Sequence, residues 1–264
     1  MAASLVQQKF GAAAPDYATS EVHAKGASLA RLLQLVAPEP RWRVLDVATG
    51  AGHTALAFAP LVAKVTASDI TEAMLAEARR LAASRGFANF KTVRAEAEDL
   101  PFPDMSFDLV TCRLAAHHFA DVAAFVAEAY RVLMPNGRLA LVDNISPDQS
   151  ILPKLSPTET EHWAAAYNAF EKLRDPSHIR CLGLRQWSDL LVEAGFDGVT
   201  SEHMDQDLEF APWVQRMRCA EPTIARLGTL LRESPLHDFL KPRETETGTV
   251  FTLQEVIMLA RKPG

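Results

Sequence analysis

The stretch VLDVATGAGHTA, residues 44–55, decides the fold, because it reads as a buried strand, a glycine-rich turn and the start of a helix. Such a unit presents free backbone N–H groups and the positive end of a helix dipole to a ligand. Gly50 and Gly52 carry no Cβ, so a ligand could approach the backbone closely there. Two alignments compete. Residues 50–55 fit the dinucleotide fingerprint G-x-G-x-x-G/A, whereas residues 46–52 fit an acidic, glycine-rich loop in which Ala48 replaces a usual glycine.

Two carboxylates help to choose between these alignments. Asp69 ends the second predicted strand, seventeen positions after Gly52, where a carboxylate can accept hydrogen bonds from both hydroxyls of a ribose. Both classes of cofactor contain a ribose, so Asp69 does not separate them. Asp46 lies inside the first strand, where a negative charge would oppose a pyrophosphate and would attract an ammonium and a sulfonium. Charge complementarity therefore favours S-adenosylmethionine.

Strand-like and helical segments alternate along the chain. Thr71 and Asp121 are candidate N-caps, and Gly86 and Gly195 are placed to end helices. The alternation implies parallel βαβ units with right-handed crossovers. We expect an α/β, three-layer Rossmann-like fold with a seven-stranded, mostly parallel sheet, helices on both faces and helical insertions covering the active face. The predicted strands are 43–47, 63–68, 90–95, 107–112, 138–142, 199–204 and 250–260, with a turn at 135–137 before the fifth.

The regular alternation is interrupted twice, by proline-containing segments with helical character. We therefore expect a single domain, residues 1–264, built from four parts. These are an N-terminal helical lid (1–40), a cofactor-binding core (41–145) and two insertions (146–183 and 211–243) that form a substrate cap.

The composition describes an ordinary globular protein. Hydrophobic residues make up 48% of the 264 residues, charged residues 23%, and the formal net charge is −6. No basic cluster indicates a nucleic-acid partner. The three cysteines have neither metal-ligand nor disulfide spacing, and no segment has the length of a membrane span. These features predict a cytoplasmic protein without a metal site or a membrane span, and the apolar insertions are compatible with a homodimer.

Four motifs, in order, resemble the class I S-adenosylmethionine-dependent methyltransferases, and in particular the group of ubiquinone and menaquinone biosynthesis C-methyltransferases. The resemblance covers residues 44–144, and a less distinctive N-terminal stretch, FGAAAPDYATSEVH, resembles the lid of that group. The four motifs are VLDVATGAG, VTASDITEAMLAEAR, AEAEDLPFPDMSFDLVTCR and EAYRVLMPNGRLALVDN.

The resemblance implies which residues bind the cofactor. Asp46, with the backbone of Thr49 and Gly50, would face the methionine portion, and Gly52 would let the loop pass close to it. Asp69 would hold the ribose hydroxyls. The other implied positions are Ile70 and Met74 near the ribose and adenine, Glu96 and Ala97 at the adenine amine, Arg113 at the methionine amino group, and Tyr17 closing the lid.

Three residues depart from the family's pattern. Ala48 and Asn136 replace glycines, and Glu96 replaces the commoner aspartate. Ala48 matters most, because its methyl group projects where the family has none. We expect its backbone to lie in the ordinary β region, where a Cβ costs little.

Methyl transfer to a protonated acceptor needs a base, and three histidines are candidates. His117 and His118 follow the fourth strand, at the edge where open α/β sheets bind their ligands. His178 belongs to a polar cluster, residues 174–178, in a region expected to cover the site. The alternatives are that one of the first pair packs in the fold while the other caps a helix, and that the cluster is a solvated turn. Trp163, Tyr167 and Phe170, at helical spacing, are more typical of a core than of a substrate wall.

We therefore expect an enzyme that transfers a methyl group from S-adenosylmethionine to carbon, oxygen or nitrogen of a small-molecule acceptor by in-line displacement. Two alternatives remain open at this stage. One is a non-catalytic S-adenosylmethionine-binding protein, and the other is a nicotinamide-dependent oxidoreductase that uses the half-match at residues 50–55.

Overall fold

The computed structural model describes residues 5, 7, 10, 11, 14 and 26–264. Tyr17, predicted to close the lid, lies outside them. The described residues form two compact units. The core unit comprises those as far as Asp143, together with Asp189–Glu202 and Ile257–Gly264, and the second unit comprises Asn144–Ser188 and His203–Val256.

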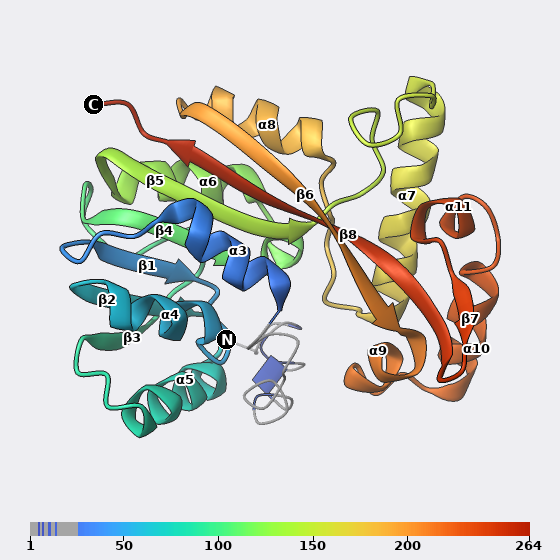
Figure 1. Ribbon diagram of the computed structural model, residues 1–264, viewed down its shortest axis with the longest axis horizontal. Coiled ribbons are helices and arrows are strands. Elements are labelled where there is room, and N and C mark those ends of the chain that lie inside the picture. Colours follow the sequence, from blue (N-terminus) through green and yellow to red (C-terminus); the bar gives the residue numbers. More distant parts are fainter. Residues whose placement is uncertain (1–4, 6, 8–9, 12–13, 15–25) are drawn as a thin grey trace. The chain divides into compact units, whose positions relative to one another are not determined.

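The strands of the described residues form one sheet with the order β3-β2-β1-β4-β5-β8-β6, and a short strand, β7, pairs with β8 (Figure 1). The pairs β1–β2, β1–β4, β2–β3 and β4–β5 are parallel, and β7–β8 is antiparallel. The predicted mostly parallel Rossmann-like sheet is confirmed, and β7 is an eighth strand that was not expected. The bounds are β1 Arg43–Val47, β2 Lys64–Asp69, β3 Phe90–Arg94, β4 Phe107–Arg113, β5 Leu133–Asn144, β6 Asp197–Glu209, β7 Arg243–Thr245 and β8 Gly248–Arg261.

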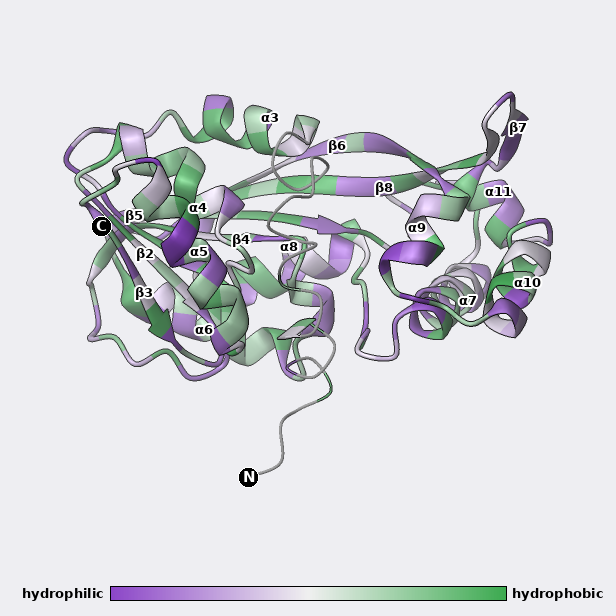
Figure 2. Cartoon of the chain, turned by 90° about the horizontal axis from the view of Figure 1, so that it is seen from below, coloured by the Kyte–Doolittle hydropathy of each residue, from purple (hydrophilic) through white to green (hydrophobic). Residues whose placement is uncertain are grey.

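Helices cover the sheet of the core unit on both faces. Helices α3, α4 and α5 lie on one face, and α6 lies on the other (Figure 1). The central strands β1 and β4 are buried between these layers. The long strand β8 carries mainly hydrophobic residues (Figure 2). The elements are α3 Ala27–Val36, α4 His53–Phe58, the 3₁₀ turn η1 Ala59–Leu61, α5 Glu72–Ser84, the 3₁₀ turn η2 Ala116–His118 and α6 Val122–Val132.

The predicted helix ends hold in three of four cases. Asp121 caps α6 by accepting a hydrogen bond from the backbone N–H of Ala124 at 2.9 Å. Gly86 and Gly195, with φ of 72° and 94°, follow α5 and α8 in the left-handed backbone that ends helices. Thr71 occupies the N-cap position of α5, but its side chain makes no capping hydrogen bond.

The turn predicted at residues 135–137 lies inside a longer strand, since β5 begins at Leu133. Asn136 has a φ of 64°, a conformation that asparagine tolerates better than most residues. The register of β5 against β4 shifts between Phe107 and Leu109. An irregularity within β5, rather than a turn before it, therefore explains the Asn136-Gly137 sequence.

The second unit contains both predicted insertions. Its helices are α7 Pro157–Arg174, the first half of α8 Leu184–Glu193, α9 Phe210–Arg216, α10 Glu221–Leu230 and α11 Leu236–Leu240. Tyr167 and Phe170 are fully buried in its core with Trp213, and Trp163 packs against that core. These aromatic residues are therefore core, as their helical spacing predicted. That the insertions cap a substrate stays a prediction.

No helix among the described residues is long and apolar enough to cross a membrane.

In the same part of the chain, no cluster of three or more His, Cys, Asp or Glu side chains is arranged to hold a metal ion.

Candidate functional site

The loop between β1 and α4 has a left-handed backbone at three positions. The φ angles are 51° at Ala48, 55° at Gly50 and 88° at Gly52. The expectation that Ala48 lies in the β region is therefore wrong. A left-handed conformation costs a residue with a Cβ about 1–2 kcal/mol, so the alanine that replaces the family's glycine is strained. The loop is closed by backbone bonds from Thr49 N–H to the Ser68 carbonyl and from Gly52 N–H to the Thr49 carbonyl, both 2.9 Å.

The two glycines of the loop have different reasons for being glycine. A Cβ on Gly52 would lie 2.8 Å from the Cβ of Ala78 in α5, so this residue permits helix and loop to pack together. A Cβ on Gly50 would meet no heavy atom of the described residues within 4 Å. Gly50, rather than Gly52, therefore borders open space, and it is the position where a ligand can approach the backbone.

Asp46 is buried and fully engaged with the loop. Its Oδ2 accepts hydrogen bonds from the Thr49 hydroxyl at 2.5 Å and the Ala55 N–H at 3.2 Å, and its Oδ1 accepts one from the Thr111 hydroxyl at 2.6 Å. Burial raises the pKa of Asp46 to about 6, although the bonds from Thr111 and Thr49 and the charge of Arg113 act against this rise. A cation bound beside the loop would favour the ionised form.

Asp69 joins the first and second strands at their carboxyl ends. Its Oδ2 accepts the Gly50 N–H and its Oδ1 accepts the Thr71 N–H, both at 2.8 Å. The residue is only 8% exposed, and burial raises its pKa. Each oxygen of a carboxylate can accept two hydrogen bonds, so Asp69 retains the capacity to accept one more on each oxygen. Two neighbouring hydroxyls, such as those of a ribose, match this capacity.

These residues fit S-adenosylmethionine better than a dinucleotide. Asp46 and Asp69 are two buried carboxylates that accept hydrogen bonds from the loop. A pyrophosphate would be repelled by this arrangement, whereas a ligand with a ribose and a positive charge matches it.

The positions implied for adenine binding lie around the ends of β2 and β3. Asp69 pairs with Arg94, so the chain that leaves β3 reaches the same edge of the sheet. There Ala97 is 8% exposed, whereas Glu96 is exposed. Of the positions implied near the ribose and adenine, Ile70 is half-buried, and Met74 in α5 is 2% exposed.

Described residues of the N-terminal segment contact this site. The Gln7 amide donates a hydrogen bond to the Ile70 carbonyl at 3.1 Å. The ring of Phe10 meets the ring of His118 edge-on, with centroids 5.1 Å apart. Ala14 is buried in a small apolar cluster with residues of the loop and α5. These three residues therefore pack on the part of the fold where the resemblance implies a lid.

Arg113 ends β4 and links the strand to two helices. Its Nε donates to the Thr54 hydroxyl at 3.2 Å, and its Nη1 donates to the Ser28 hydroxyl at 3.4 Å. The guanidinium thus holds α4 and α3 against the end of the strand. The use of the Arg113 backbone to bind a methionine amino group stays a prediction.

His117 pairs with a carboxylate that the sequence analysis did not identify as a site residue. The His117 Nδ1 lies 2.6 Å from Asp143 Oδ1, and the His117 N–H donates to Asp143 Oδ2 at 2.9 Å. Asp143 is 1% exposed and lies near the end of β5. The rings of His117 and His118 are neighbours, with centroids 4.3 Å apart. A signal for Asp143 was present in the sequence: it is a carboxylate at the carboxyl end of an apolar strand, the edge where α/β sheets bind ligands.

His178, the third candidate base, lies in the second unit. It is 2% exposed, and its Nε2 lies 2.9 Å from the Asn168 amide oxygen. The same oxygen accepts the Cys181 N–H at 2.6 Å. The alternative of a solvated turn is wrong, because Asp175 and Ser177 are also buried. A catalytic role for His178 stays a prediction.

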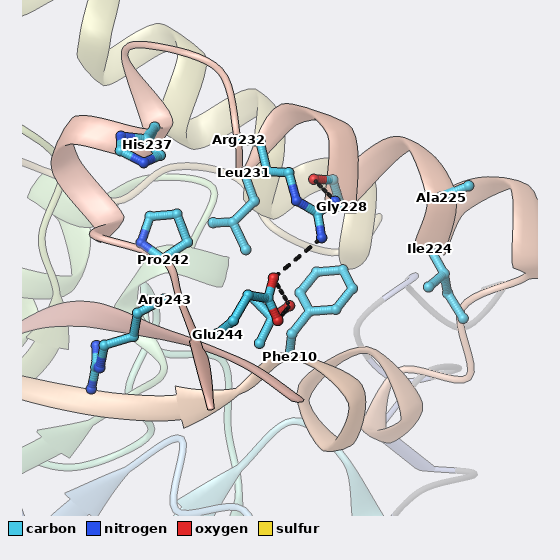
Figure 3. A pocket seen from close by; sticks show the side chains of 11 residues that line it. Phe210, Ile224, Ala225, Gly228, Leu231, Arg232, His237, Pro242, Arg243 and Glu244 are labelled. Atoms are coloured by element: carbon cyan, nitrogen blue, oxygen red, sulfur yellow. Dashed lines mark hydrogen bonds and ion pairs between the residues drawn. The ribbon is translucent and has the colours of Figure 1, made fainter. Parts of the chain in front are cut away.

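The second unit holds a cavity of about 350 Å³, bordered by α9, α10, α11 and β7 (Figure 3). Phe210 and Leu231 line its apolar side. On its polar side, Arg232 Nη2 lies 3.5 Å from Glu244 Oε1, and the Thr249 hydroxyl donates to the same oxygen at 2.9 Å. Because Arg232 and Glu244 form an ion pair with each other, together they present no net charge to a bound ion. None of the predicted site residues lines this cavity.

Comparison with known proteins gives the family. Residues 45–141 match the family model described as a methyltransferase domain. YcgJ of Bacillus subtilis, an uncharacterized methyltransferase, is 35% identical over 207 residues, and the match covers 78% of each chain. The ubiquinone/menaquinone biosynthesis C-methyltransferase UbiE of Pseudomonas putida is 34% identical over 184 residues, which cover 61% of this chain and 68% of UbiE.

Solved structures agree with the sequence relatives. A structure from Bacillus halodurans, described as a candidate methyltransferase, has a TM-score of 0.82 at 37% identity and covers 90% of this chain and 100% of that one. The sheet and the loop between β1 and α4 thus define the class of the protein, a class I methyltransferase. The chain belongs to the family of S-adenosylmethionine-dependent methyltransferases and is an enzyme of that family. The dinucleotide alignment of residues 50–55 is therefore wrong.

Proposed function

We propose that this enzyme binds S-adenosylmethionine at the carboxyl ends of β1 and β2 and transfers its methyl group to a small-molecule acceptor. The observation that carries the proposal is the pair of buried carboxylates around a loop that borders open space at Gly50. When bound, the cofactor supplies an electrophilic methyl carbon, and its sulfur takes the electron pair of the broken bond.

The chain's own residues would bind and orient the two reactants. Each carboxylate oxygen of Asp69 already accepts one backbone N–H and accepts a second hydrogen bond from a ribose hydroxyl. Asp46 shapes the loop through Thr49 and contributes negative charge toward the methionine portion. The remaining contacts follow the motif order: Thr49 and Gly50 backbone at the methionine, Ile70 and Met74 at the ribose and adenine, Glu96 and Ala97 at the adenine amine, Arg113 at the amino group, and Tyr17 over the cofactor.

Other parts of the expectation stay predictions of the same proposal. The acceptor is a small molecule, and neither a nucleic-acid partner nor a membrane span is expected. The protein works in the cytoplasm, without a metal, and its apolar insertions are compatible with a homodimer.

Titration calorimetry with S-adenosylmethionine and the variant Asp69→Ala tests the cofactor site. A hydrogen bond to a charged group contributes about 1.5–3 kcal/mol, so losing two should weaken binding at least about 100-fold. Asp197→Ala is the matched control, because Asp197, in β6, belongs to the same unit but forms an ion pair with Arg261 in β8, 2.9 Å away. Unchanged affinity in Asp69→Ala would contradict the assignment. Asp69→Asn, which keeps the side-chain size, serves if the alanine variant does not fold.

The same measurement separates the alternative of a binding protein without activity. If the wild-type protein binds the cofactor tightly but forms no methylated product with a broad set of acceptors, the catalytic part of the proposal fails while the binding part stands.

A further inference from the structure

We infer that His117 and Asp143 form a catalytic pair in which Nε2 of His117 takes the proton of the methyl acceptor and Asp143 is the positioning residue. The inference rests on the proposed function. It assigns the role of base to His117 rather than to the adjacent His118, and it adds Asp143 to the proposed site.

The pair is built by neighbouring strands. Strands β4 and β5 are parallel and pair Arg113 with Val142, so the segments that follow them reach the same edge of the sheet. From β4 the chain enters the 3₁₀ turn Ala116–His118, which brings His117 beside the end of β5. Asp143 is the next residue after Val142. Base and carboxylate both belong to the core unit, whose own strand pairing brings them together.

Asp143 holds His117 at two points. One carboxylate oxygen accepts the backbone N–H at 2.9 Å, and the other lies 2.6 Å from Nδ1. Short contacts of this kind are typical of charge-assisted hydrogen bonds. Asp143 is 1% exposed. Because it contacts both the backbone N–H and the ring of His117, it fixes the orientation of the ring at the carboxyl end of β5.

The pairing also sets the tautomer. A carboxylate accepts a hydrogen bond, so it favours the proton on Nδ1 and leaves Nε2 as the basic nitrogen of the neutral ring. When Nε2 gains a proton, the negative charge of Asp143 stabilises the imidazolium. The His117 side chain keeps 13% of its surface accessible, so the pair is not sealed in the core. The ring of His118 lies beside the rings of Phe10 and His117.

Asp143 belongs to the same acidic edge as the cofactor loop. Cys112 pairs with Val47 across β4 and β1, and its thiol is completely buried. The pKa of this thiol is raised first by burial and then by the charges of Asp143, Asp46 and Asp69. Because Cys112 pairs with Val47 on one side and with Leu141 on the other, the carboxyl ends of β1, β4 and β5 lie side by side, and His117 and Asp143 lie at the same edge of the sheet as the proposed cofactor site.

The chemistry follows from this arrangement. Nε2 of His117 accepts the proton from the O–H or C–H bond of the acceptor, whose electron pair forms the new bond to the methyl carbon. The electrons of the broken carbon–sulfur bond remain on sulfur, and the proton remains on the imidazolium beside Asp143 until solvent removes it. An acceptor that must lose a proton before it is methylated needs this base, whereas an amine, which attacks through its free lone pair, does not.

Steady-state methylation of 4-methoxyphenol and 4-nitrophenol at pH 8.5 tests the inference, with product measured by chromatography. General-base catalysis contributes about 10²–10⁴-fold. We expect His117→Ala to lower kcat at least 100-fold on 4-methoxyphenol with KM for S-adenosylmethionine unchanged, and to lower it far less on 4-nitrophenol, which is already ionised. Added imidazole should restore activity to His117→Ala. Asp143→Asn should lower kcat at least tenfold on the same substrate.

His118→Ala is the neighbouring comparison, and His203→Ala, at an exposed His–Asp pair of the second unit, is the control for a histidine outside the site. His117→Gln keeps the ring's approximate size if the alanine variant does not fold. Equal losses on the two phenols, no rescue by imidazole, or a larger loss in His118→Ala would overturn the inference. So would wild-type protein that methylates benzylamine but neither phenol. Cofactor binding measured by calorimetry on each variant distinguishes these outcomes from failure of the proposed function, because His117→Ala should bind S-adenosylmethionine as the wild type does.

Discussion

Replacing Ala48 with glycine should make the folded protein more stable, although glycine usually destabilises. Ala48 has a φ of 51°, a left-handed backbone that costs an L-residue with a Cβ about 1–2 kcal/mol. Glycine removes this cost but gives the unfolded chain more freedom, which costs about 0.5–1 kcal/mol. The expected net gain is about 0.5–1 kcal/mol in the free energy of unfolding, or about 1–4 °C in Tm for a domain of this size.

Gly50 supplies the matched control two residues along the same loop. Its φ is 55°, and a Cβ there would meet no heavy atom within 4 Å in the part of the chain that the structure describes, so Gly50→Ala changes backbone strain without a clash there. We expect a loss of about 0.5–1 kcal/mol, opposite in sign to the Ala48→Gly gain. Urea unfolding followed by circular dichroism, with and without S-adenosylmethionine, measures both. A lower stability in Ala48→Gly, or a silent Gly50→Ala, would refute the assignment of left-handed strain to this loop.

Two further predictions concern the same loop. The pKa of Asp46 is raised to about 6 from an ordinary value of 3.8, so the stability that this raised pKa confers is present at low pH and is lost as the pH rises through about 6. The free energy of unfolding without cofactor, measured in urea, should fall between pH 5 and pH 7 by about 1 kcal/mol more in the wild type than in Asp46→Asn. Parallel pH profiles of the two proteins would argue against this assignment. Gly52→Ala should cost about 2–4 kcal/mol, because its Cβ adds a 2.8 Å contact with Ala78 to left-handed strain. A Tm within 1 °C of the wild type would show that α5 yields instead, and Ala78→Gly in the same background should recover part of the loss.

The sequence was sufficient to predict the features that depend on local pattern. The apolar residues of the stretch 43–47, followed by a glycine turn, predict the first strand at its observed bounds. Asp121 is recognisable as a cap because it precedes an amphipathic helix. Such signals need only neighbouring residues.

Features that depend on contacts between distant segments could not be predicted in this way. The pairing of His117 with Asp143 needs the register of β4 against β5, and the two residues are 26 positions apart. Gly52 is glycine because of Ala78, on a helix that begins after the next strand. The φ of Ala48 follows from closing the loop onto Ser68 in that strand. In each case, tertiary geometry decides what the residue does.

The acidic edge of the sheet ties cofactor binding to folding. Asp46 accepts a hydrogen bond from Thr49 of the loop, and Asp69 accepts one from Gly50. The same carboxylates therefore hold the loop in shape and give the proposed cofactor site its negative charge. Burying these acids raises their pKa, which means that their ionised forms are disfavoured without a cation. A positively charged ligand would relieve this cost, and some of its binding energy would therefore appear as stabilisation of the loop. Removing either carboxylate must weaken both the loop and the binding, so only the comparison of alanine and asparagine variants, measured with and without ligand, separates the two contributions.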